Sequence, residues 1–241
     1  MPKRAGIILV GNEILSGKIV DANAAYLCRE LRALGVDVRR ITVIPDEVAV
    51  IAVDVRAFSD EFDLVFTSGG VGPTHDDVTI EGVATAMGVR VVRHPALVAL
   101  LERYYGGAVT DAHLRMAEVP EGAELVGQSL RFPTILMRNV YILPGVPEIF
   151  RQKFDALRER FRDDPFHLKC VFVRIGEGVL AEHLNSLLVD FPALLLGSYP
   201  EFSNPEYRVK VTLESRDGAY LEGALARFLA ALPVDAVVKV T

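Results

Sequence analysis

Cysteine is scarce in this sequence, and what there is follows no metal or disulfide pattern. The two cysteines, Cys28 and Cys170, lie far apart and show neither CxxC nor Cys/His spacing. This spacing excludes a disulfide framework and a structural zinc site as organising features. A reducing cytosol fits best, and we expect a cytoplasmic protein.

Basic clusters and long apolar runs are also missing. The chain carries 32 acidic and 26 basic side chains, a formal net charge of −6, and no stretch rich in Lys and Arg. We therefore expect no nucleic-acid partner. The apolar run near the N-terminus is about six residues long, too short for a secretory signal. No window approaches the roughly 18 apolar residues of a membrane span, so we expect no membrane association.

Short apolar runs alternate with helical patterns over residues 1–165. This alternation predicts βαβ units and a parallel sheet covered on both faces. The segment Gly106–Pro133 is expected to be irregular, helical at most over His113–Glu118. The predicted strands are Gly6–Val10, Val36–Ile44, Asp63–Thr67, Val89–Val92 and Asn139–Leu143. The predicted helices are Asp21–Leu34, Glu47–Phe58, Ile80–Met87, Pro95–Tyr105 and Pro147–Phe161.

The rhythm changes after a polar hinge at Arg162–Pro165. Residues 166–241 read as strand, helix, strand, strand, helix, strand, which is typical of a small ferredoxin-like or KH-like α+β domain. Its Gly176-Glu177-Gly178 is not the GxxG clamp of KH domains, so RNA binding is not expected. We predict two domains, residues 1–165 and 166–241.

Four polar or glycine-rich segments each follow a predicted strand of the first domain. They are Gly11–Gly17, Pro45–Glu47, Ser68–Asp77 and Leu143–Glu148. Because ligands of open α/β sheets bind outside the carboxyl ends of the strands, these segments should meet in one crevice.

The segment Ser68–Asp77 has the character of a phosphate cradle. Its glycines allow close approach of backbone to a ligand, and it leads into a helix whose N-terminus suits an anion. It lacks the lysine of a Walker A loop and the GxGxxG spacing of a dinucleotide fingerprint. The alternative is a tight strand-to-helix turn without ligand.

Five acidic residues lie in these segments: Glu13, Asp46, Glu47, Asp76 and Asp77. Carboxylates beside a phosphate repel it unless a divalent cation or a proton-transfer role compensates, so we expect a bridging Mg²⁺, with Mn²⁺ or Co²⁺ as alternatives.

Several of these polar residues have a structural role as the alternative to ligand binding. Asp77 and Asp21 have the alternative of capping the helices that follow them. His75 contacts a phosphate, donates a proton or is a solvated loop residue.

The same motifs, taken in order, resemble the molybdopterin-binding domain family, in particular its CinA-type competence/damage-inducible branch. They are VGNEILSGKIVDANAAYL from Val10, IPDE from Ile44, TSGGVGPTHDDVT from Thr67 and LPGVPEI from Leu143. The stretch LGSYPEFSNPEYRVKVTLES from Leu196 is similar to the region behind the molybdopterin-binding domain of eukaryotic FAD synthase.

The resemblance implies a Rossmann-like three-layer α/β/α domain with a small α/β appendage. Cofactor-building members bind molybdopterin and carry aspartates that match Asp46 and Asp77. The CinA and FAD-synthase branches are associated with metal-dependent cleavage of a pyrophosphate bond. The chain departs from CinA proteins at Gln128–Thr134, and it ends before a deamidase domain, so we expect no amidase activity.

The resulting hypothesis is a divalent-metal-dependent pyrophosphohydrolase of a nucleotide diphosphate conjugate, ADP-ribose or FAD. A molybdopterin-binding protein of molybdenum cofactor biosynthesis and a non-catalytic ligand-binding protein are the alternatives. We assign catalysis to Asp46, Asp76 and Asp77, with the metal on Asp46 and Asp77. A nucleotide- or pterin-like phosphate ligand would contact Gly11, Asn12, Glu13, Ser16, Ser68, Gly69, Gly70, Gly72, Thr74, His75, Pro144 and Gly145. We also expect a homo-oligomer.

Overall fold

The computed structural model describes residues 2–127 and 132–241, and its contacts divide the chain into two compact units. The units are residues 1–163 and 164–241. The predicted departure from the CinA pattern at Gln128–Thr134 lies largely outside the described residues.

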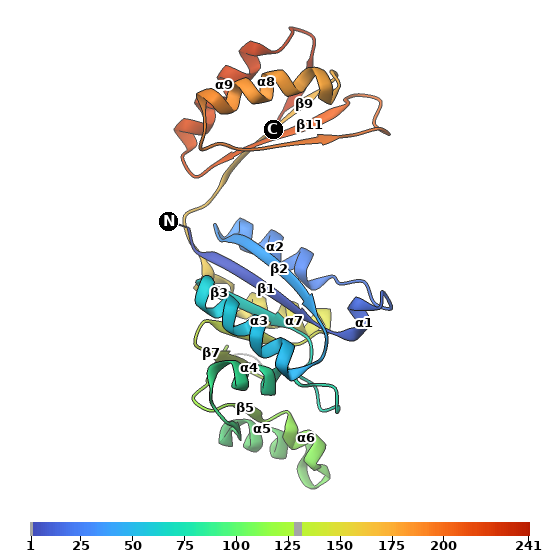
Figure 1. Ribbon diagram of the computed structural model, residues 1–241, viewed down its shortest axis with the longest axis vertical. Coiled ribbons are helices and arrows are strands. Elements are labelled where there is room, and N and C mark those ends of the chain that lie inside the picture. The colour runs from blue at the N-terminus through green and yellow to red at the C-terminus, as the bar shows by residue number, and fades with distance from the viewer. Residues whose placement is uncertain (1, 128–131) are drawn as a thin grey trace. The chain divides into compact units, whose positions relative to one another are not determined.

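The first unit is built on a mixed six-stranded sheet (Figure 1). Its strands are β1 (Arg4–Val10), β2 (Asp37–Ile44), β3 (Leu64–Ser68), β6 (Glu124–Val126), β7 (Thr134–Met137) and β8 (Val140–Leu143). They lie in the order β2-β1-β3-β8-β7-β6. The neighbouring strands β2, β1, β3 and β8 run parallel, as predicted. Strand β7 pairs antiparallel with β8, and β6 pairs antiparallel with β7.

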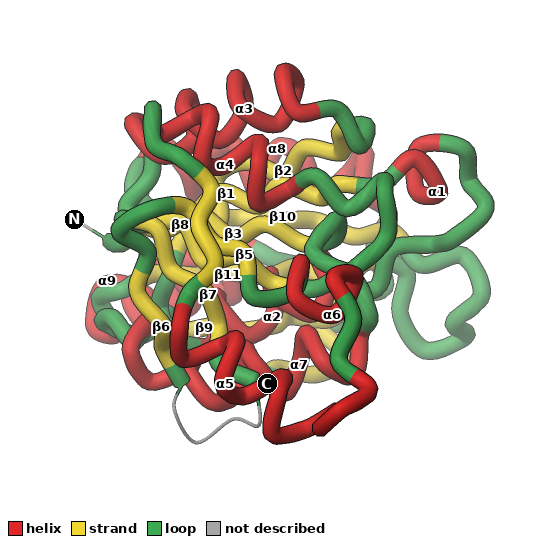
Figure 2. Tube along the Cα trace, turned by 90° about the horizontal axis from the view of Figure 1, so that it is seen from below, coloured by secondary structure: helices red, strands yellow, loops and turns green. Residues whose placement is uncertain are grey.

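Helices cover both faces of this sheet. The α-helices of this unit are α1 (Asn12–Leu15), α2 (Asn23–Ala33), α3 (Val48–Glu61), α4 (Thr79–Met87), α5 (Pro95–Tyr105), α6 (Asp111–Arg115) and α7 (Pro147–Leu157), of which α1 and α6 bury no residue. Alternate residues of a strand point to opposite faces, so Ile7 and Leu9 of β1 pack with α2 and α7. Ile8 and Val10 pack with α3 and α4 on the other face. Figure 2 shows the strands between these two helical layers.

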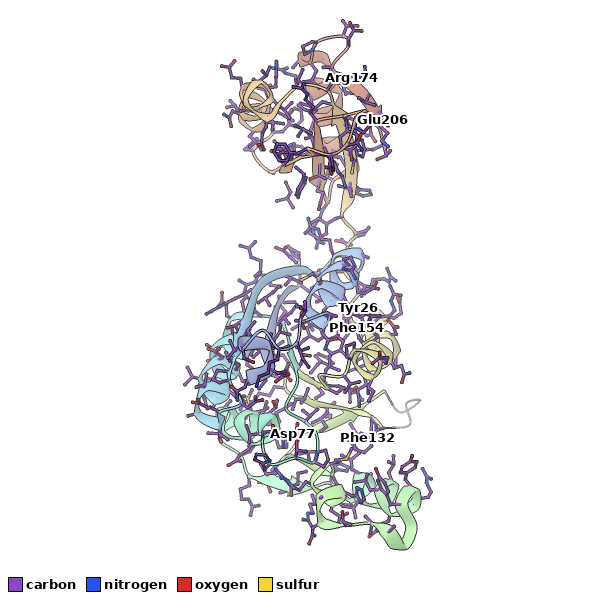
Figure 3. The ribbon with its side chains drawn as sticks, turned by 90° about the vertical axis from the view of Figure 1, so that its right-hand side faces the viewer. Tyr26, Asp77, Phe132, Phe154, Arg174 and Glu206 are labelled. Atoms are coloured by element: carbon purple, nitrogen blue, oxygen red, sulfur yellow. The ribbon has the colours of Figure 1, made fainter. Side chains whose placement is uncertain are left out.

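An aromatic cluster fixes α7 to the sheet. Phe66 of β3 lies edge-on to Phe161, which stacks on Phe154 of α7 at 5.5 Å between ring centroids. Phe154 also meets the Tyr26 ring of α2 edge-to-face at 5.8 Å (Figure 3). Burial and a 2.6 Å hydrogen bond to Asp155 raise the pKa of Tyr26. The cluster sets the position of α7, which borders the pocket described below.

The segment between β4 (Val91–Arg93) and β7 differs from the prediction. β4 does not extend the parallel sheet; it pairs antiparallel with β5 (Glu118–Pro120) in a separate two-stranded sheet. The expected irregular segment contains the short helix α6 and the strands β5 and β6. The predicted helix over His113–Glu118 is only partly correct, because α6 begins at Asp111 and ends at Arg115.

The second unit has the predicted βαββαβ order. Its elements are β9 (His167–Val173), α8 (Glu177–Asp190), β10 (Leu195–Pro200), β11 (Val209–Ser215), α9 (Gly218–Ala231) and β12 (Val237–Val240). The antiparallel sheet has the order β10-β11-β9-β12, which is the ferredoxin-like arrangement. Within the described residues of both units, every helix is too short or too polar to span a lipid bilayer.

Candidate functional site

The four segments predicted to converge follow β1, β2, β3 and β8, the four strands that run parallel. Parallel pairing puts their carboxyl ends on one edge of the sheet. A cavity of about 830 Å³ opens there. This volume lies in the upper part of the ~300–1,000 Å³ range of small-molecule pockets.

The turn after β3 passes unusually close to the end of β1. Gly69 has a φ of 106°, and a Cβ at this position would lie 2.1 Å from the carbonyl oxygen of Val10. Gly70 follows with a φ of 63°. Gly145, after β8, has its own Cβ position 3.4 Å from the Cα of Gly69. Only glycine permits this combination of left-handed backbone and close packing.

The glycine turn offers unused hydrogen-bond donors to the cavity. Gly70, Val71 and Gly72 line the pocket, and their backbone N–H groups donate to no acceptor in the described part of the chain. Residues 73–78 separate the turn from α4 in the chain, but the N–H of Thr79, the first residue of α4, donates to the Gly70 carbonyl, so Gly70 lies beside the helix N-terminus. Free N–H groups at a helix N-terminus are a binding site for phosphate.

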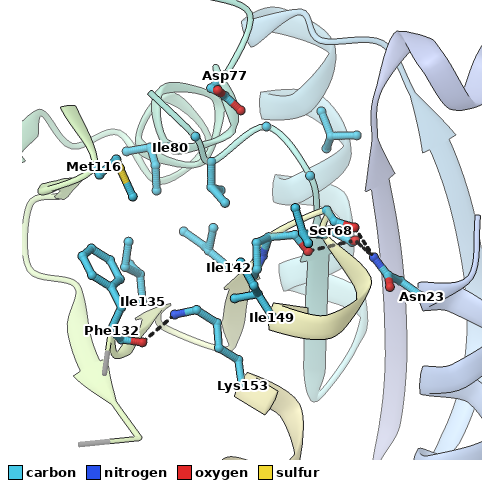
Figure 4. A pocket seen from close by; sticks show the side chains of 18 of the residues that line it. Asn23, Ser68, Asp77, Ile80, Met116, Phe132, Ile135, Ile142, Ile149 and Lys153 are labelled. Atoms are coloured by element: carbon cyan, nitrogen blue, oxygen red, sulfur yellow. Dashed lines mark hydrogen bonds between the residues drawn. The ribbon is translucent and has the colours of Figure 1, made fainter. Parts of the chain in front are cut away.

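Asn23, which the sequence patterns did not single out, ties two of the segments together (Figure 4). Its buried amide nitrogen donates to Ser68 Oγ at 3.0 Å and to the Gly145 carbonyl at 2.8 Å. The N-cap of α2 is Ala22 and not Asp21, but the carboxylate of Asp21 accepts from the N–H groups of Asn23 and Ala24 and so holds the first turn of α2. The strand-end rule missed Asn23 because it belongs to a helix.

Asp77 does not cap α4, so that alternative is wrong. The N-cap position is Val78, and no side chain caps it. The Asp77 carboxylate instead turns back over the loop, where it accepts from the N–H of Thr74 at 2.9 Å and from the Thr74 hydroxyl. It lines the cavity with one oxygen beside Gly72. Asp77 is thus held in place next to the free N–H groups.

About half of the predicted site residues line the cavity. Those that do are Glu13, Ser68, Gly69, Gly70, Gly72, Asp77, Pro144 and Gly145. Gly11, Asn12, Ser16, Asp46, Thr74, His75 and Asp76 lie outside its lining.

Most of the outlying residues have other contacts. Asp46 accepts from the Asn12 N–H at 2.8 Å, and so joins the segments after β1 and β2. The His75 side chain is 96% exposed. Asp76 is also exposed, and hydrogen bonding from the Thr74 side chain lowers its pKa.

The lining of the cavity also contains many apolar side chains and one buried lysine. Lys153 of α7 is only 9% exposed, and its amine donates to the carbonyls of Phe132 and Pro133 at 2.8 and 2.7 Å. Burial lowers the pKa of Lys153 to about 8. The sequence offered no signal for this site, since a lysine in an amphipathic helix reads as a surface residue.

The donor set for a cation is sparse. Nowhere in the described residues do three or more His, Cys, Asp or Glu side chains group as in a ready-made metal cage. Mg²⁺ is commonly held by one or two carboxylates together with phosphate oxygens of the substrate. Asp77 and Glu13, which both line the cavity, fit that kind of site.

Comparison with known proteins follows the division into two units. Residues 6–163 match the family described as probable molybdopterin binding domain. The chain belongs to this family. Residues 165–241 match the family described as FAD synthase, middle domain. The resemblance expected from the motifs is therefore confirmed in both units.

Individual relatives agree with the family match. A protein from Archaeoglobus fulgidus is 38% identical over 223 residues, 92% of this chain and 95% of the relative. A probable FAD synthase of Caenorhabditis elegans is 30% identical over 93% of this chain, which spans about half (49%) of that protein. A crystal structure of the protein CinA, of unknown function, from Thermoplasma acidophilum aligns at a TM-score of 0.61 and 34% identity, over 67% of this chain and 100% of that one.

Replacing Gly69 with alanine should disrupt the edge of the sheet. The new methyl group would overlap the Val10 carbonyl and force an L-residue into a strained φ. We expect Gly69→Ala to lower the free energy of unfolding by about 2–4 kcal/mol in denaturant titrations. Gly107→Ala is the control, because nothing lies within 4 Å of its Cβ position. Equal unfolding midpoints would contradict the described packing.

Asn23 should matter for ligand binding beyond its effect on stability. Asn23→Ala removes two hydrogen bonds, a loss of about 2 kcal/mol, and releases the glycine turn from Gly145. Inorganic pyrophosphate affinity, measured by calorimetry, should fall at least about tenfold, or ~1.4 kcal/mol. The control is Asn139→Ala, which removes a similar buried network at the opposite end of β8. If both variants bind pyrophosphate equally, Asn23 has no role in the site.

Lys153 should make stability depend on pH. Its pKa is depressed in the fold, so the unfolded chain binds more protons between pH 8 and about 10.4, and stability rises with pH in that window. Between pH 7 and 9.5, wild type should gain about 2 kcal/mol of unfolding free energy relative to Lys153→Met. Denaturant titrations of both proteins give this difference. A constant difference would show that Lys153 titrates normally.

Proposed function

We propose that this protein hydrolyses the pyrophosphate bond of a nucleotide diphosphate conjugate such as FAD or ADP-ribose. The oxygen of water adds to one phosphorus atom, and the bond from that phosphorus to the bridging oxygen breaks. The products are AMP and a second phosphate ester, FMN or ribose 5-phosphate. The proton of the attacking water passes to a carboxylate at the pocket.

The observation that carries the proposal is the row of unused N–H groups at Gly70, Val71 and Gly72. They line the cavity, and the hydrogen bond from Thr79 N–H to the Gly70 carbonyl brings them beside the α4 N-terminus. Anionic oxygens of a diphosphate satisfy such donors, and the helix dipole favours their charge. The N–H groups donate to the phosphate oxygens and make no contact with phosphorus, so the phosphorus atom stays accessible to the attacking water.

The carboxylates beside this cradle supply the second requirement. Asp77 is fixed by Thr74 and borders Gly72, so it lies next to the bound diphosphate. Asp77 and Glu13 would hold a divalent cation together with phosphate oxygens. Such a cation lowers the pKa of bound water and neutralises charge on the bridging oxygen. Asp46 positions the segment after β1 through its bond to Asn12.

Membership of the probable molybdopterin binding domain family supports a second candidate, a protein that binds or transfers a pterin phosphate. The same cradle would hold the terminal phosphate of the pterin. The two candidates differ in turnover, because only the first releases AMP from a dinucleotide.

Release of AMP from FAD and from ADP-ribose decides between them. The purified chain is incubated with each substrate and with Mg²⁺, Mn²⁺, Co²⁺ or chelator, and AMP is quantified by chromatography. We expect metal-dependent AMP. If no metal gives AMP from either compound, hydrolysis of these substrates is excluded, and pterin handling or ligand binding without catalysis takes its place.

Asp77 and Asp76 make a matched pair for this assay. Both were assigned to catalysis from the sequence, but only Asp77 lines the cavity, so the proposed function keeps Asp77 and leaves out its neighbour Asp76. Asp77→Asn should lower kcat by about 10²-fold or more, because it removes a proposed ligand of the cation and an acceptor for the proton of the attacking water. Asp76→Asn should stay within about threefold of wild type, or ~0.7 kcal/mol. Equal losses in both variants would contradict the assignment of Asp77.

A further inference from the structure

Strand β10 of the second unit differs from the other edge strands in carrying no charge. Among the strands that the structure describes, β2, β6, β10 and β12 lie at the edges of the two larger sheets. Charged side chains, bulges and short length keep such edges from pairing with other chains. Strand β2 contains an aspartate and two arginines, β6 is three residues long and includes a glutamate, and β12 has a register shift and a lysine. Strand β10 reads LLGSYP, and its proline, Pro200, stands at the last position.

The side chains of β10 add exposed apolar surface to this unprotected edge. Leu196 packs into the core beneath α8 and α9, so Leu195 and Tyr199 point to the opposite face of the sheet. Both are roughly half exposed. The ring of Tyr199 lies over Gly197 on that face, where a Cβ would come within 2.8 Å of the Tyr199 hydroxyl. Exposed apolar surface on an uncharged edge strand marks a site of contact with another chain.

The backbone of β10 also has hydrogen-bonding groups that point away from its own sheet. Just beyond the strand, Glu201 donates its N–H to the Arg208 carbonyl, in register with the pairing of β10 and β11. Because antiparallel ladders alternate, the odd-numbered residues of β10 bond to β11, and the even-numbered residues face the open edge. Leu196 and Ser198 therefore present N–H and C=O groups to a further strand.

We infer that β10 pairs antiparallel with β10 of a second copy of this chain, about a two-fold axis at Gly197. In this register Leu196 lies opposite Ser198 of the second copy, and these two residues exchange backbone hydrogen bonds. Leu195 and Tyr199 then oppose each other in a non-hydrogen-bonded pair, where side chains approach most closely. A two-fold axis on a charged strand can bring like charges together, and an uncharged strand has no such conflict.

Exposed apolar residues also flank β10 at both ends. Val189, near the end of α8, is largely exposed, and Phe202, which follows β10, is 97% exposed. Antiparallel pairing brings the residues that precede β10 in one copy towards those that follow it in the other. The contact then extends beyond the paired strands, as a stable dimer needs, because specific interfaces bury upwards of about 1,000 Å².

Sedimentation equilibrium of the full chain tests the pairing. We expect wild type to associate to twice the 26.4 kDa of one chain, or to another even multiple of it. Val53→Lys is the control, because Val53 is an exposed apolar residue of α3 in the first unit. This control should leave the Kd of association unchanged.

Two double variants with charges at the same positions test the register. Leu195→Lys with Tyr199→Lys places like charges opposite each other across the axis, whereas Leu195→Lys with Tyr199→Glu places opposite charges there. Both lose the apolar pairs, so they are compared with each other. The Kd of the like-charged variant should be at least about tenfold higher, because two unfavourable pairs replace two favourable ones. Thermal unfolding checks that each variant is folded.

Three outcomes would overturn the inference. A wild type that is monomeric, or that contains an odd number of chains, excludes the pair and leaves the edge of β10 to a strand of another protein. Double variants that associate as tightly as wild type place the interface elsewhere. Equal Kd values in the two double variants, or no association in either, exclude the register centred on Gly197. The AMP assay enters none of these outcomes, so the proposed function stands or fails separately.

Discussion

The contact between Gly69 and the carbonyl of Val10 determines the geometry of the whole pocket. The backbone after β3 crosses the end of β1 so closely that a Cβ on Gly69 would lie 2.1 Å from that oxygen. This places Gly69 against Gly145, and Asn23 then bonds both Ser68 and Gly145. Three strand ends are thereby joined without a charged side chain. Beyond Gly69, whose N–H donates to the Leu143 carbonyl, the N–H groups of Gly70, Val71 and Gly72 have no acceptor among the described residues.

Burial of Lys153 is possible because α7 is anchored elsewhere. Desolvation of one amine costs on the order of a few kcal/mol at neutral pH, judged from its lowered pKa. Phe154, one residue further along, lies in the aromatic cluster with Phe66 and Phe161. Each such ring pair contributes about 0.5–1.5 kcal/mol beyond its buried area. Helix α7 thus carries the destabilising buried amine of Lys153, and the aromatic contacts of Phe154 on the same helix offset that cost.

How much the sequence predicts depends on how local each feature is. The parallel core follows from the alternation of apolar runs and helices, and the strand-end rule located the glycine turn and Asp77. The strands β5 and β6 were missed because each is three residues long, too short to show an alternating pattern, and is defined by its pairing with β4 or β7. Asn23 and Lys153 were missed for a related reason. Both lie in regular helices, where their residue type has an ordinary surface explanation, and their hydrogen-bond partners lie 20 or more residues away in the chain.

The charges around the pocket explain why a cation is part of the proposed chemistry. The segment Ser68–Asp77 contains no Lys or Arg, and the cationic side chains that line the cavity, Arg115 and Lys153, belong to α6 and α7. In the proposed function, a diphosphate at the cradle would meet neutral N–H dipoles and the carboxylate of Asp77, with Glu13 as a second carboxylate in the lining of the same cavity. Dipoles at one helix end correspond to roughly half a positive charge, which does not balance a diphosphate and two carboxylates. A divalent cation shared between phosphate and carboxylate supplies the missing charge. Binding of a diphosphate and binding of the metal should then be thermodynamically linked, each raising the affinity of the other.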